Sequence, residues 1–296
     1  MNGRYAPSPT GDLHLGNLRT ALLAWLFARS AGSRFFMRVE DLDTGRVRPG
    51  LAERQLADLA AIGLDWDPPV LTQSERLDVY AGALARLDAE GALYPCYCTR
   101  REIREAASAP HGPLPEGAYP GTCRELTAAQ RAARERAGRP PALRLRAGGE
   151  RVGYADRLLG PVEAVVDDVV VRRNDGAPAY NLASVVDDAA QGVEEVVRGA
   201  DLAETTPRQI LLARRLGLPV PAYAHVPLVL GPDGARLAKR HGAVTLADRR
   251  EPPERVRGRL AESVGLAEPG ETPDMATLLT RFDPATLPRE ATRLAA

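Results

Sequence analysis

The residues best suited to chemistry lie near the N-terminus, in the stretch Arg-Tyr-Ala-Pro-Ser-Pro-Thr-Gly-Asp-Leu-His-Leu-Gly-Asn at positions 4–17. Its prolines and Gly11 predict a sharp turn after a first strand, followed by a helix. The first turn of a helix presents free N–H groups and the positive end of the helix dipole. Together these favour an anion such as phosphate.

Two residues of this stretch could act on a bound phosphate. His14 could donate a hydrogen bond to charge that develops in a transition state, and Gly16 would let a ligand approach the backbone. A structural alternative stays open, in which His14 is a turn histidine and Asn17 caps the helix.

Lys239 is a second candidate, because it is the only lysine among the 39 basic residues of the chain and all the others are arginine. An ammonium group is a compact point charge, whereas a guanidinium group is a wide planar fork. A site that places one positive charge beside a phosphate could therefore reject arginine. The alternative is that one lysine is present by chance.

The first ninety residues predict strands that alternate with helices. Apolar spacing indicates a helix at 18–29, and the aromatic and apolar segment 34–40 indicates a strand. Helical patterns follow at about 50–62 and 74–90, separated by a turn-rich segment at 65–69. This alternation predicts an α/β fold with a parallel sheet.

The later part of the chain continues with shorter elements. We expect a polar helix at 127–137, strands near 142–146 and 162–173, and a hairpin-like turn at 174–178. Apolar segments at 182–186 and 193–197 are expected to return the chain to the sheet. A helix at 205–216, a strand with a tight turn at 226–234 and a helical tail complete the prediction.

All three cysteines, Cys96, Cys98 and Cys123, lie within residues 94–124, a segment rich in proline and glycine. Two close thiolates and a distant third suit one structural metal ion in a module too small for its own core, and thiolates favour zinc. Three unrelated thiols are the alternative. We expect no catalytic role for this metal, because no pattern of nucleophile and base accompanies it.

Composition limits the possible classes of protein. Basic and acidic residues are equal at 39 each, so net charge gives no argument for a nucleic-acid partner. The sequence has no apolar run of about 20 residues and no leader-like N-terminus, so we expect neither a membrane partner nor export. An odd number of cysteines argues against a disulfide framework. The cytoplasm is the expected compartment.

Several blocks of the chain, in order, resemble the class I aminoacyl-tRNA synthetases of the glutamyl branch. The first block is the stretch from Ala6 to Asn17, which is similar to the first signature of that class. The others are Arg38-Val-Glu-Asp-Leu-Asp-Thr44, Ala179-Tyr-Asn-Leu-Ala183, Val196-Val-Arg-Gly-Ala-Asp-Leu202, Thr206-Pro-Arg-Gln209 and Arg236-Leu-Ala-Lys-Arg-His-Gly242. The resemblance covers roughly residues 3–245.

The resemblance implies a Rossmann-like catalytic domain that carries a zinc-binding insertion and ends in a short helical tail. The expected boundaries are 1–93 for the first half of the catalytic domain and 94–124 for the zinc-binding insertion. They continue with 125–245 for the rest of an acceptor-like insertion and the second half of the catalytic domain, and 246–296 for the tail.

The resemblance also implies roles for single residues. It implies a glutamate pocket lined by Arg4, Ala6, Ser8, Glu40, Tyr180 and Arg198. Arg4 and Arg198 are the candidates for carboxylate contacts, and Glu40 for the α-ammonium group.

For ATP, which enters with Mg²⁺, the resemblance implies binding by His14, Gly16, Asn17 and Lys239. Of these, His14 and Lys239 are the expected catalytic residues. The second signature departs from the family pattern at Ala238, where a serine is common, so one hydroxyl contact could be missing.

For the zinc ion, the resemblance to the glutamyl-Q tRNA(Asp) synthetase family implies Tyr119 as the fourth ligand beside the three cysteines. Tyrosine is an unusual zinc ligand, and His111 is the more ordinary alternative.

The expected activity is attack of glutamate on ATP, which forms glutamyl-adenylate, followed by transfer to RNA. In that family the acceptor is queuosine in the anticodon of tRNA(Asp). Only 57 residues follow Lys239, so we expect no anticodon-binding domain, and we expect a monomer. Two alternatives stay open: a truncated glutamyl-tRNA synthetase that charges the 3′ end of tRNA(Glu), and an inactive glutamate- or nucleotide-binding module.

Overall fold

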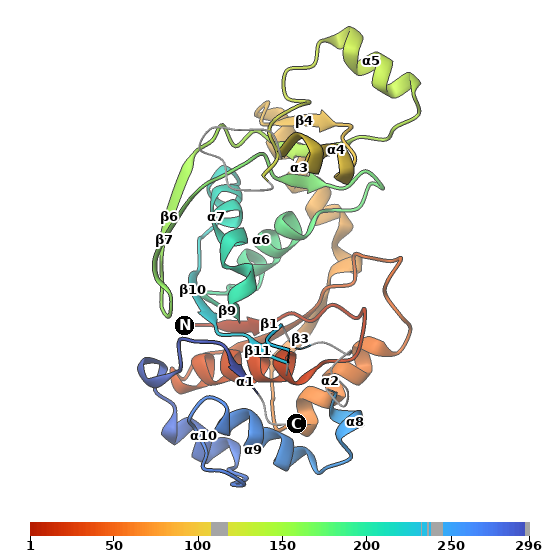
Figure 1. Cartoon of the computed structure of the whole chain (residues 1–296). Helices are drawn as coiled ribbons and strands as arrows, with labels where there is room; N and C mark the ends of the chain where they lie inside the picture. Colours follow the sequence, from red (N-terminus) through yellow and green to blue (C-terminus); the bar gives the residue numbers. More distant parts are fainter. Residues whose placement is uncertain (108–117, 232, 236, 238–244, 294–296) are drawn as a thin grey trace.

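The computed structural model describes residues 1–107, 118–231, 233–235, 237 and 245–293, with only the backbone at 100, 104, 106 and 107 (Figure 1). The helices are α1 Leu15–Ser30, α2 Leu51–Ala61, α3 Leu77–Ala89, α4 Arg100–Ala107, α5 Ala128–Arg136, α6 Tyr180–Ala190, α7 Thr206–Arg215, α8 Leu246–Arg249, α9 Pro253–Glu262 and α10 Met275–Arg281. The strands are β1 Gly3–Tyr5, β2 Phe35–Val39, β3 Asp67–Thr72, β4 Leu93–Cys96, β5 Ala142–Leu145, β6 Arg151–Asp156, β7 Gly160–Val165, β8 Val170–Arg172, β9 Glu195–Gly199, β10 Ala222–Val226, β11 Val229–Leu230 and β12 Thr292–Arg293.

Two groups of parallel strands meet at the centre of the molecule. Strands β1, β2 and β3 pair in that order, and β9 pairs with β10, all parallel. The carbonyl oxygen of Asn2, just before β1, accepts hydrogen bonds from the N–H groups of Glu194 and Glu195 at the start of β9. The spatial order is therefore β3-β2-β1-β9-β10, which is the Rossmann order with its reversal between β1 and β9. The predicted α/β Rossmann-like fold is confirmed.

Helices cover both faces of this sheet, as alternation along the strands requires. Phe35 and Met37 of β2 and Val197 of β9 pack into a core with α1, α9 and α10. Phe36 and Val196 point to the other side, into a core with α3, α6 and α7. Figure 1 shows the sheet between these two groups of helices.

The cysteine-containing segment lies at the end of the molecule opposite α9 and α10 (Figure 1). Its strand β4 pairs antiparallel with β5, which pairs antiparallel with β8. The helix α5, which has no buried residue, extends from this end. The domain boundaries given above stay a prediction.

The C-terminal part contains the predicted helices and one unexpected strand pair. Strand β12 pairs in parallel with β11, the strand that precedes the second signature. The buried side chain of Arg19, on α1, donates hydrogen bonds to Thr292 Oγ1 of β12 and to the carbonyl oxygen of Pro227. Within the described residues, no helix is long and apolar enough to cross a membrane.

Two expectations about local structure were wrong, and one strand was missed. The turn-rich segment 65–69 partly forms β3, an edge strand, where prolines are tolerated because one side needs no N–H donors. The apolar segment 182–186 belongs to α6, because a short apolar run fits a buried helix as well as a strand. Strand β6, at 151–156, was not expected at all.

Candidate active site

The first signature forms a tight turn that ends in a capped helix. The Nδ1 atom of His14 accepts a hydrogen bond from the backbone N–H of Asn17 at 3.1 Å. The side chain of Asn17 accepts one in return from the N–H of His14 at 3.2 Å. This reciprocal capping box makes His14 itself the N-cap of α1, so the capping role that was considered for Asn17 is shared by both residues.

The cap also decides which nitrogen of His14 carries the proton. Because Nδ1 accepts a hydrogen bond, a neutral His14 ring must be protonated at Nε2. The structural role and a role as donor to phosphate therefore use different nitrogens of one ring, and the two interpretations of His14 are compatible.

Gly16 provides space for this histidine. A Cβ atom at position 16 would lie 3.0 Å from both Cε1 and Nδ1 of His14 and 3.5 Å from Cβ of Val229. Any side chain at this position would therefore press on the imidazole ring. Gln55 of α2 stabilises the turn, because its Nε2 donates hydrogen bonds to the carbonyl oxygens of Ser8 and Gly11 at 3.0 and 2.6 Å.

The described flanks of the second signature lie close to the first one. Thr245 forms an isolated antiparallel bridge with His14, and the N–H of Leu237 donates to the carbonyl oxygen of Val229 at 2.8 Å. Lys239 and Ala238 lie outside the described residues, so their roles stay predictions.

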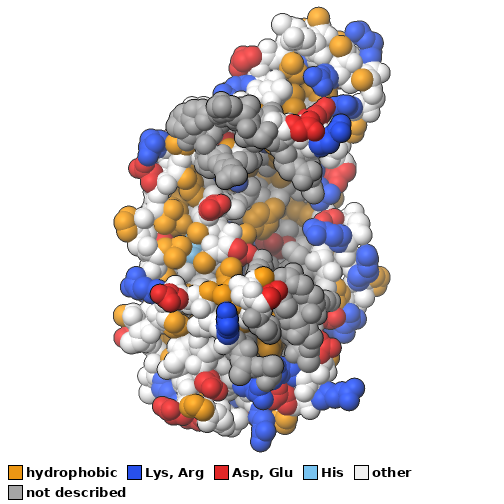
Figure 2. All heavy atoms as spheres, in the orientation of Figure 1, with side chains coloured by type: hydrophobic (Ala, Val, Ile, Leu, Met, Phe, Trp, Pro, Cys, Tyr) orange, Lys and Arg blue, Asp and Glu red, His pale blue; other side chains and the backbone are white. Residues whose placement is uncertain are grey.

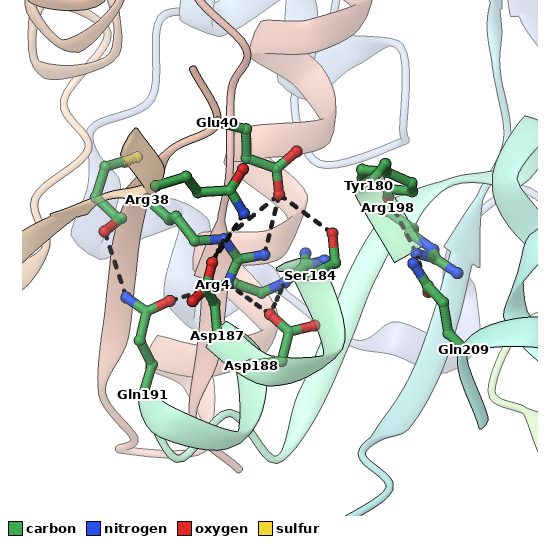
Figure 3. A network of polar contacts seen from close by, with 12 residues as sticks. Arg4, Arg38, Glu40, Tyr180, Ser184, Asp187, Asp188, Gln191, Arg198 and Gln209 are labelled. Carbon is green, nitrogen blue, oxygen red and sulfur yellow. Dashed lines mark hydrogen bonds and ion pairs between the residues drawn. The ribbon is translucent and has the colours of Figure 1, made fainter. Parts of the chain in front are cut away.

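One wall of the site is a buried ionic network, which we call the ionic wall: Arg4, Arg38, Glu40, Asp187 and Asp188 (Figure 3). Arg38 has no exposed side-chain surface and joins the carboxylates of Asp188 at 2.7 Å and Glu40 at 3.1 Å. Arg4 pairs with Asp188 at 3.2 Å. Asp187, also fully buried, accepts hydrogen bonds from the side chains of Gln73, Arg76 and Tyr80.

The carboxylates of this wall differ in how well they are compensated. Burial alone would raise the pKa of Asp188, but the guanidinium groups of Arg38 and Arg4 outweigh this effect, so the pKa lies below its usual value. Burial raises the pKa of Glu40 above its usual value, and the same arginines offset it only in part. Glu40 is therefore a buried anion that still lacks part of its stabilisation.

The opposite wall surrounds Arg198, at the carboxyl end of β9, with uncharged groups, and we call it the neutral wall. The guanidinium donates to Gln209 Oε1 and Thr206 Oγ1, each at 2.7 Å, and to His225 Nε2 at 3.1 Å. It also reaches the hydroxyl of Tyr180 at 3.4 Å (Figure 3). Among the residues that the structure describes, no carboxylate forms an ion pair with Arg198, although only 5% of it is exposed.

The two walls enclose a cavity of about 670 Å³ that opens beside the N-terminus of α1. It lies at the reversal point between β1 and β9, where open α/β sheets bind ligands. Every described residue predicted for glutamate or ATP lines it: Arg4, Ala6, Ser8, His14, Gly16, Asn17, Glu40, Tyr180 and Arg198. The structure thus brings these residues together, and their roles as glutamate or ATP ligands stay predictions.

A larger cleft of about 1250 Å³ joins this cavity to the cysteine-containing segment, because Ser8, Glu40, Arg46 and Tyr180 line both. On the face of the molecule in Figure 2, basic and acidic side chains are mixed rather than gathered by sign. The cleft therefore offers a continuous route between the two sites without a uniformly basic surface.

The three cysteines converge at the far end of this cleft. Their Sγ atoms all lie within 4.8 Å of one another. The hydroxyl of Tyr119 lies 3.4 Å from Cys96 Sγ and 3.9 Å from Cys98 Sγ, and it accepts a hydrogen bond from the N–H of Cys123. The three thiols could hold a metal ion, and the Tyr119 hydroxyl lies beside them; its role as a fourth ligand stays a prediction. His111 lies outside the described residues.

Several residues that contact the buried arginines of the two walls were not assigned a role from the sequence. Thr206 and Gln209 belong to a recognised block, yet nothing in the pattern linked them to Arg198. Asp188 and Asp187 stand in the middle of an apolar helix, which is a signal for buried charge that could have been used. His225 offered no comparable signal.

Comparison with known proteins agrees with this geometry. The family model "tRNA synthetases class I (E and Q), catalytic domain" matches residues 1–255. A glutamyl-Q tRNA(Asp) synthetase of Nocardia farcinica is 65% identical over 291 residues, which are 97% of this chain and 91% of that protein. One of Symbiobacterium thermophilum is 55% identical, over 99% of this chain and 96% of the relative.

A solved structure is also similar. A glutamate tRNA ligase from Elizabethkingia meningosepticum, in complex with its amino acid, superposes with a TM-score of 0.84 at 26% identity. The match covers 100% of this chain and 67% of the ligase. The family expected from the sequence blocks is thereby confirmed: the chain belongs to the glutamyl-Q tRNA(Asp) synthetase family, within the class I tRNA synthetases of the E and Q type.

Proposed function

We propose that this protein is a ligase that activates L-glutamate with ATP and transfers the glutamyl group to queuosine in the anticodon of tRNA(Asp). The observation that carries the proposal is the pair of incompletely compensated charges in one cavity. Arg198 is a buried cation without a described carboxylate partner, and Glu40 is an anion with a side chain only 10% exposed and a raised pKa. A ligand with both a carboxylate and an ammonium group satisfies both residues.

Every α-amino acid carries one ammonium and one carboxylate group, so a preference for glutamate requires a second cation for its side-chain carboxylate. In this proposal Glu40 accepts hydrogen bonds from the α-ammonium group, and Arg198 binds a carboxylate through its guanidinium fork. Arg4 is the second candidate for a carboxylate, although Asp188 already neutralises much of its charge. The names of the relatives and of the ligase solved with its amino acid support the same substrate.

Activation then needs little more than positioning and charge. The α-carboxylate of glutamate attacks the α-phosphorus of ATP, and the bond to the leaving pyrophosphate breaks, giving glutamyl-adenylate. His14 Nε2–H and the N-terminus of α1 would stabilise the negative charge on the phosphates, with Lys239 as a further positive charge. Bound Mg²⁺ would supply additional charge neutralisation on the phosphates.

The acceptor is the finer part of the proposal. A cleft of about 1250 Å³ continues from the cavity toward the cysteines, and the relatives are named for tRNA(Asp). An acceptor hydroxyl would attack the carbonyl carbon of the adenylate, and AMP would leave. We propose that the enzyme works as a monomer.

Labelled glutamate tests activation and acceptor separately. Glutamate-dependent pyrophosphate exchange should proceed without RNA. The label should appear on tRNA(Asp) that carries queuosine, with or without its 3′-terminal adenosine, and not on queuosine-free tRNA(Asp). Labelling of tRNA(Glu) that disappears when the terminal adenosine is removed would instead support a synthetase of the ordinary kind. Absence of exchange would support an inactive binding module.

We further propose that Cys96, Cys98, Cys123 and Tyr119 hold one structural zinc ion. The donor set supports this, since three sulfur atoms and one oxygen atom converge from separate parts of the segment. Zinc would link β4 to the loop that contains Tyr119 and Cys123, where the described apolar residues form a small cluster.

Metal analysis tests this site. Protein purified without chelator should contain about one zinc atom per chain, and Cys98→Ser should lose it while pyrophosphate exchange is partly retained. Full zinc content in Tyr119→Phe would exclude Tyr119 as a ligand. A wild-type protein without zinc would refute the proposal.

A further inference from the structure

Arg198 is anchored by a chain of hydrogen bonds that leads away from the cavity. Its Nε–H donates to His225 Nε2 at 3.1 Å, and His225 Nδ1 lies 2.6 Å from Asp156 Oδ2. The side chains of His225 and Asp156 have no exposed surface. Neither residue lines the cavity, so they would act on a bound ligand only through Arg198.

The direction of each hydrogen bond in this chain is determined. Arginine can only donate, so His225 Nε2 must be the acceptor and cannot carry a proton. A neutral His225 is then protonated at Nδ1 and donates to Asp156. The hydroxyl of Thr206, 3.1 Å from the same Nε2, lies on the same side.

Asp156 is held as an acceptor by its own surroundings. Its Oδ1 accepts hydrogen bonds from the N–H groups of Leu158, Leu159 and His225 at 3.0, 2.9 and 3.2 Å. Burial alone would raise the pKa of Asp156, but the hydrogen bonds from His225 and from these N–H groups lower it below its usual value. The carboxylate therefore stays ionised and keeps the proton on Nδ1 of His225.

We propose that Asp156 and His225 are positioning residues for Arg198. Asp156 fixes the tautomer of His225 whose Nε2 accepts from Arg198, and this hydrogen bond orients the guanidinium toward the substrate carboxylate. The inference rests on the proposed function, because it takes glutamate as the ligand of Arg198.

A consequence is that protonation of His225 should weaken glutamate binding. The charged groups near its ring are Asp156 on β6, Arg198 on β9 and Arg4 on β1, and the rings of Tyr154 and Tyr223 pack against it. A second proton would place an N–H on Nε2 opposite the Nε–H of Arg198, so two donors would face each other. Burial lowers the pKa of His225, and the Asp156 hydrogen bond offsets this only in part. The weaker binding of glutamate should therefore appear at a pH below the usual pKa of histidine.

The first test is Asp156→Asn, which preserves shape and changes the tautomer. The new amide can donate to Nδ1, which moves the histidine proton to Nε2 opposite Arg198. The KM for glutamate in pyrophosphate exchange should rise roughly tenfold or more, the usual scale for a hydrogen bond to a charged group. The KM for ATP should change little. The control is Glu195→Gln. Glu195 is also a buried carboxylate and lies on β9, the strand of Arg198. It pairs with Arg157 and does not line the cavity.

The second test is His225→Gln. The amide oxygen keeps a hydrogen-bond acceptor near the position of Nε2, and the amide is not protonated between about pH 5 and about pH 7.5. The KM for glutamate should stay within about threefold of wild type at neutral pH. Between about pH 7.5 and pH 5, above the usual pKa of the glutamate side chain, the wild-type KM should rise more steeply than that of the variant. Protonation of Glu40 affects both proteins alike, so the ratio of their KM values isolates His225.

The outcomes separate this inference from the proposed function. Absence of glutamate-dependent exchange in the wild type would overturn the proposed function. An active wild type whose KM for glutamate is unchanged by Asp156→Asn would overturn the positioning role. If Asp156→Asn does not fold, parallel pH profiles of wild type and His225→Gln would overturn it instead.

Discussion

The two walls of the cavity differ in the partners that they give to a buried arginine. In the ionic wall, Arg38 is completely buried and contacts the carboxylates of Glu40 and Asp188 directly. In the neutral wall, Arg198 is almost as buried, but the hydrogen-bond partners of its guanidinium among the described residues are uncharged: amide, hydroxyl, imidazole and backbone carbonyl groups. The carboxylate of Asp156 is connected to Arg198 only through the ring of His225.

This difference separates a structural charge from one that is available to a ligand. A buried cation with carboxylate partners has little to gain from another anion, whereas one held by neutral groups is oriented and still lacks a counter-charge. The same distinction holds for the anions, since the pKa of Asp188 is lowered and that of Glu40 is raised. Arg198 and Glu40 are thus the two groups that a glutamate molecule would complete.

The largest expected effect comes from breaking the ionic wall. Arg38→Met should lower the free energy of unfolding by about 3–5 kcal/mol, because it leaves buried carboxylates without their shared cation. Denaturant unfolding measures this. Arg151→Met, at an exposed ion pair with Glu163, is the control and should cost less than about 1 kcal/mol. Equal losses in the two variants would contradict the distinction.

Breaking the neutral wall should affect binding more than stability. Arg198→Met should raise the KM for glutamate roughly 100-fold, equivalent to about 2.7 kcal/mol, as expected when a charge-assisted contact is lost. Unfolding should become easier by only about 1–2 kcal/mol, because no charged partner is left unpaired.

Arg215→Met is the control for Arg198→Met, since Arg215 pairs with Glu150 at the surface. It should leave the KM for glutamate unchanged. A destabilisation by Arg198→Met as large as that of Arg38→Met would remove the contrast between the walls.

Glu40→Gln sharpens the comparison within the ionic wall. Because the pKa of Glu40 is raised in the folded protein, its ionised form costs stability at neutral pH, and this cost disappears as pH falls through the folded pKa. The variant should therefore be more stable than wild type at pH 7, because its neutral amide does not carry this cost. This gain in stability should shrink in acid. The KM for glutamate should be roughly 30-fold higher in the variant than in wild type.

The direction of the Glu40→Gln stability change is the critical result. A variant that is less stable than wild type at neutral pH would mean that Glu40 is already fully compensated without substrate. Parallel measurement of thermal unfolding and pyrophosphate exchange on one preparation gives both quantities.

The smallest effect is expected outside both walls, at Gly16. Gly16→Ala should displace the imidazole of His14 and lower kcat for pyrophosphate exchange roughly fivefold to tenfold, with the KM for glutamate unchanged. Gly82→Ala in α3 is the matched control, because its Cβ would meet nothing within 4 Å. An unchanged kcat in Gly16→Ala would show that the ring position of His14 is not critical.

The sequence predicted those parts of the molecule that depend on local pattern. The turn before α1, the strand that ends just before Glu40 and the grouping of the cysteines all follow from residue type and spacing. The pocket residues were found through matched blocks, and their convergence follows once β1, β2 and β9 lie side by side.

What could not be predicted depends on pairs far apart in sequence. The contact of Arg4 with Asp188 joins β1 to α6, and that of His225 with Asp156 joins β10 to β6. Strand β6 escaped notice for the same reason, since the buried position at its end is the charged Asp156 rather than an apolar residue. The burial of Asp156 is explained only by its hydrogen-bond partner His225, which lies 69 residues away in the sequence.

The pairing of β12 with β11 has a consequence for synthesis on the ribosome. Strand β11 leads into the second signature, yet its partner, residues 292–293, emerges only after α8, α9 and α10 have been translated. Arg19 is synthesised early, but its hydrogen bond to Thr292 can form only after residue 292 has been translated. Because domains generally fold as units, the support beside the turn that precedes α1 forms only after these later elements have emerged. Competence for adenylate formation should therefore be acquired late in translation rather than gradually.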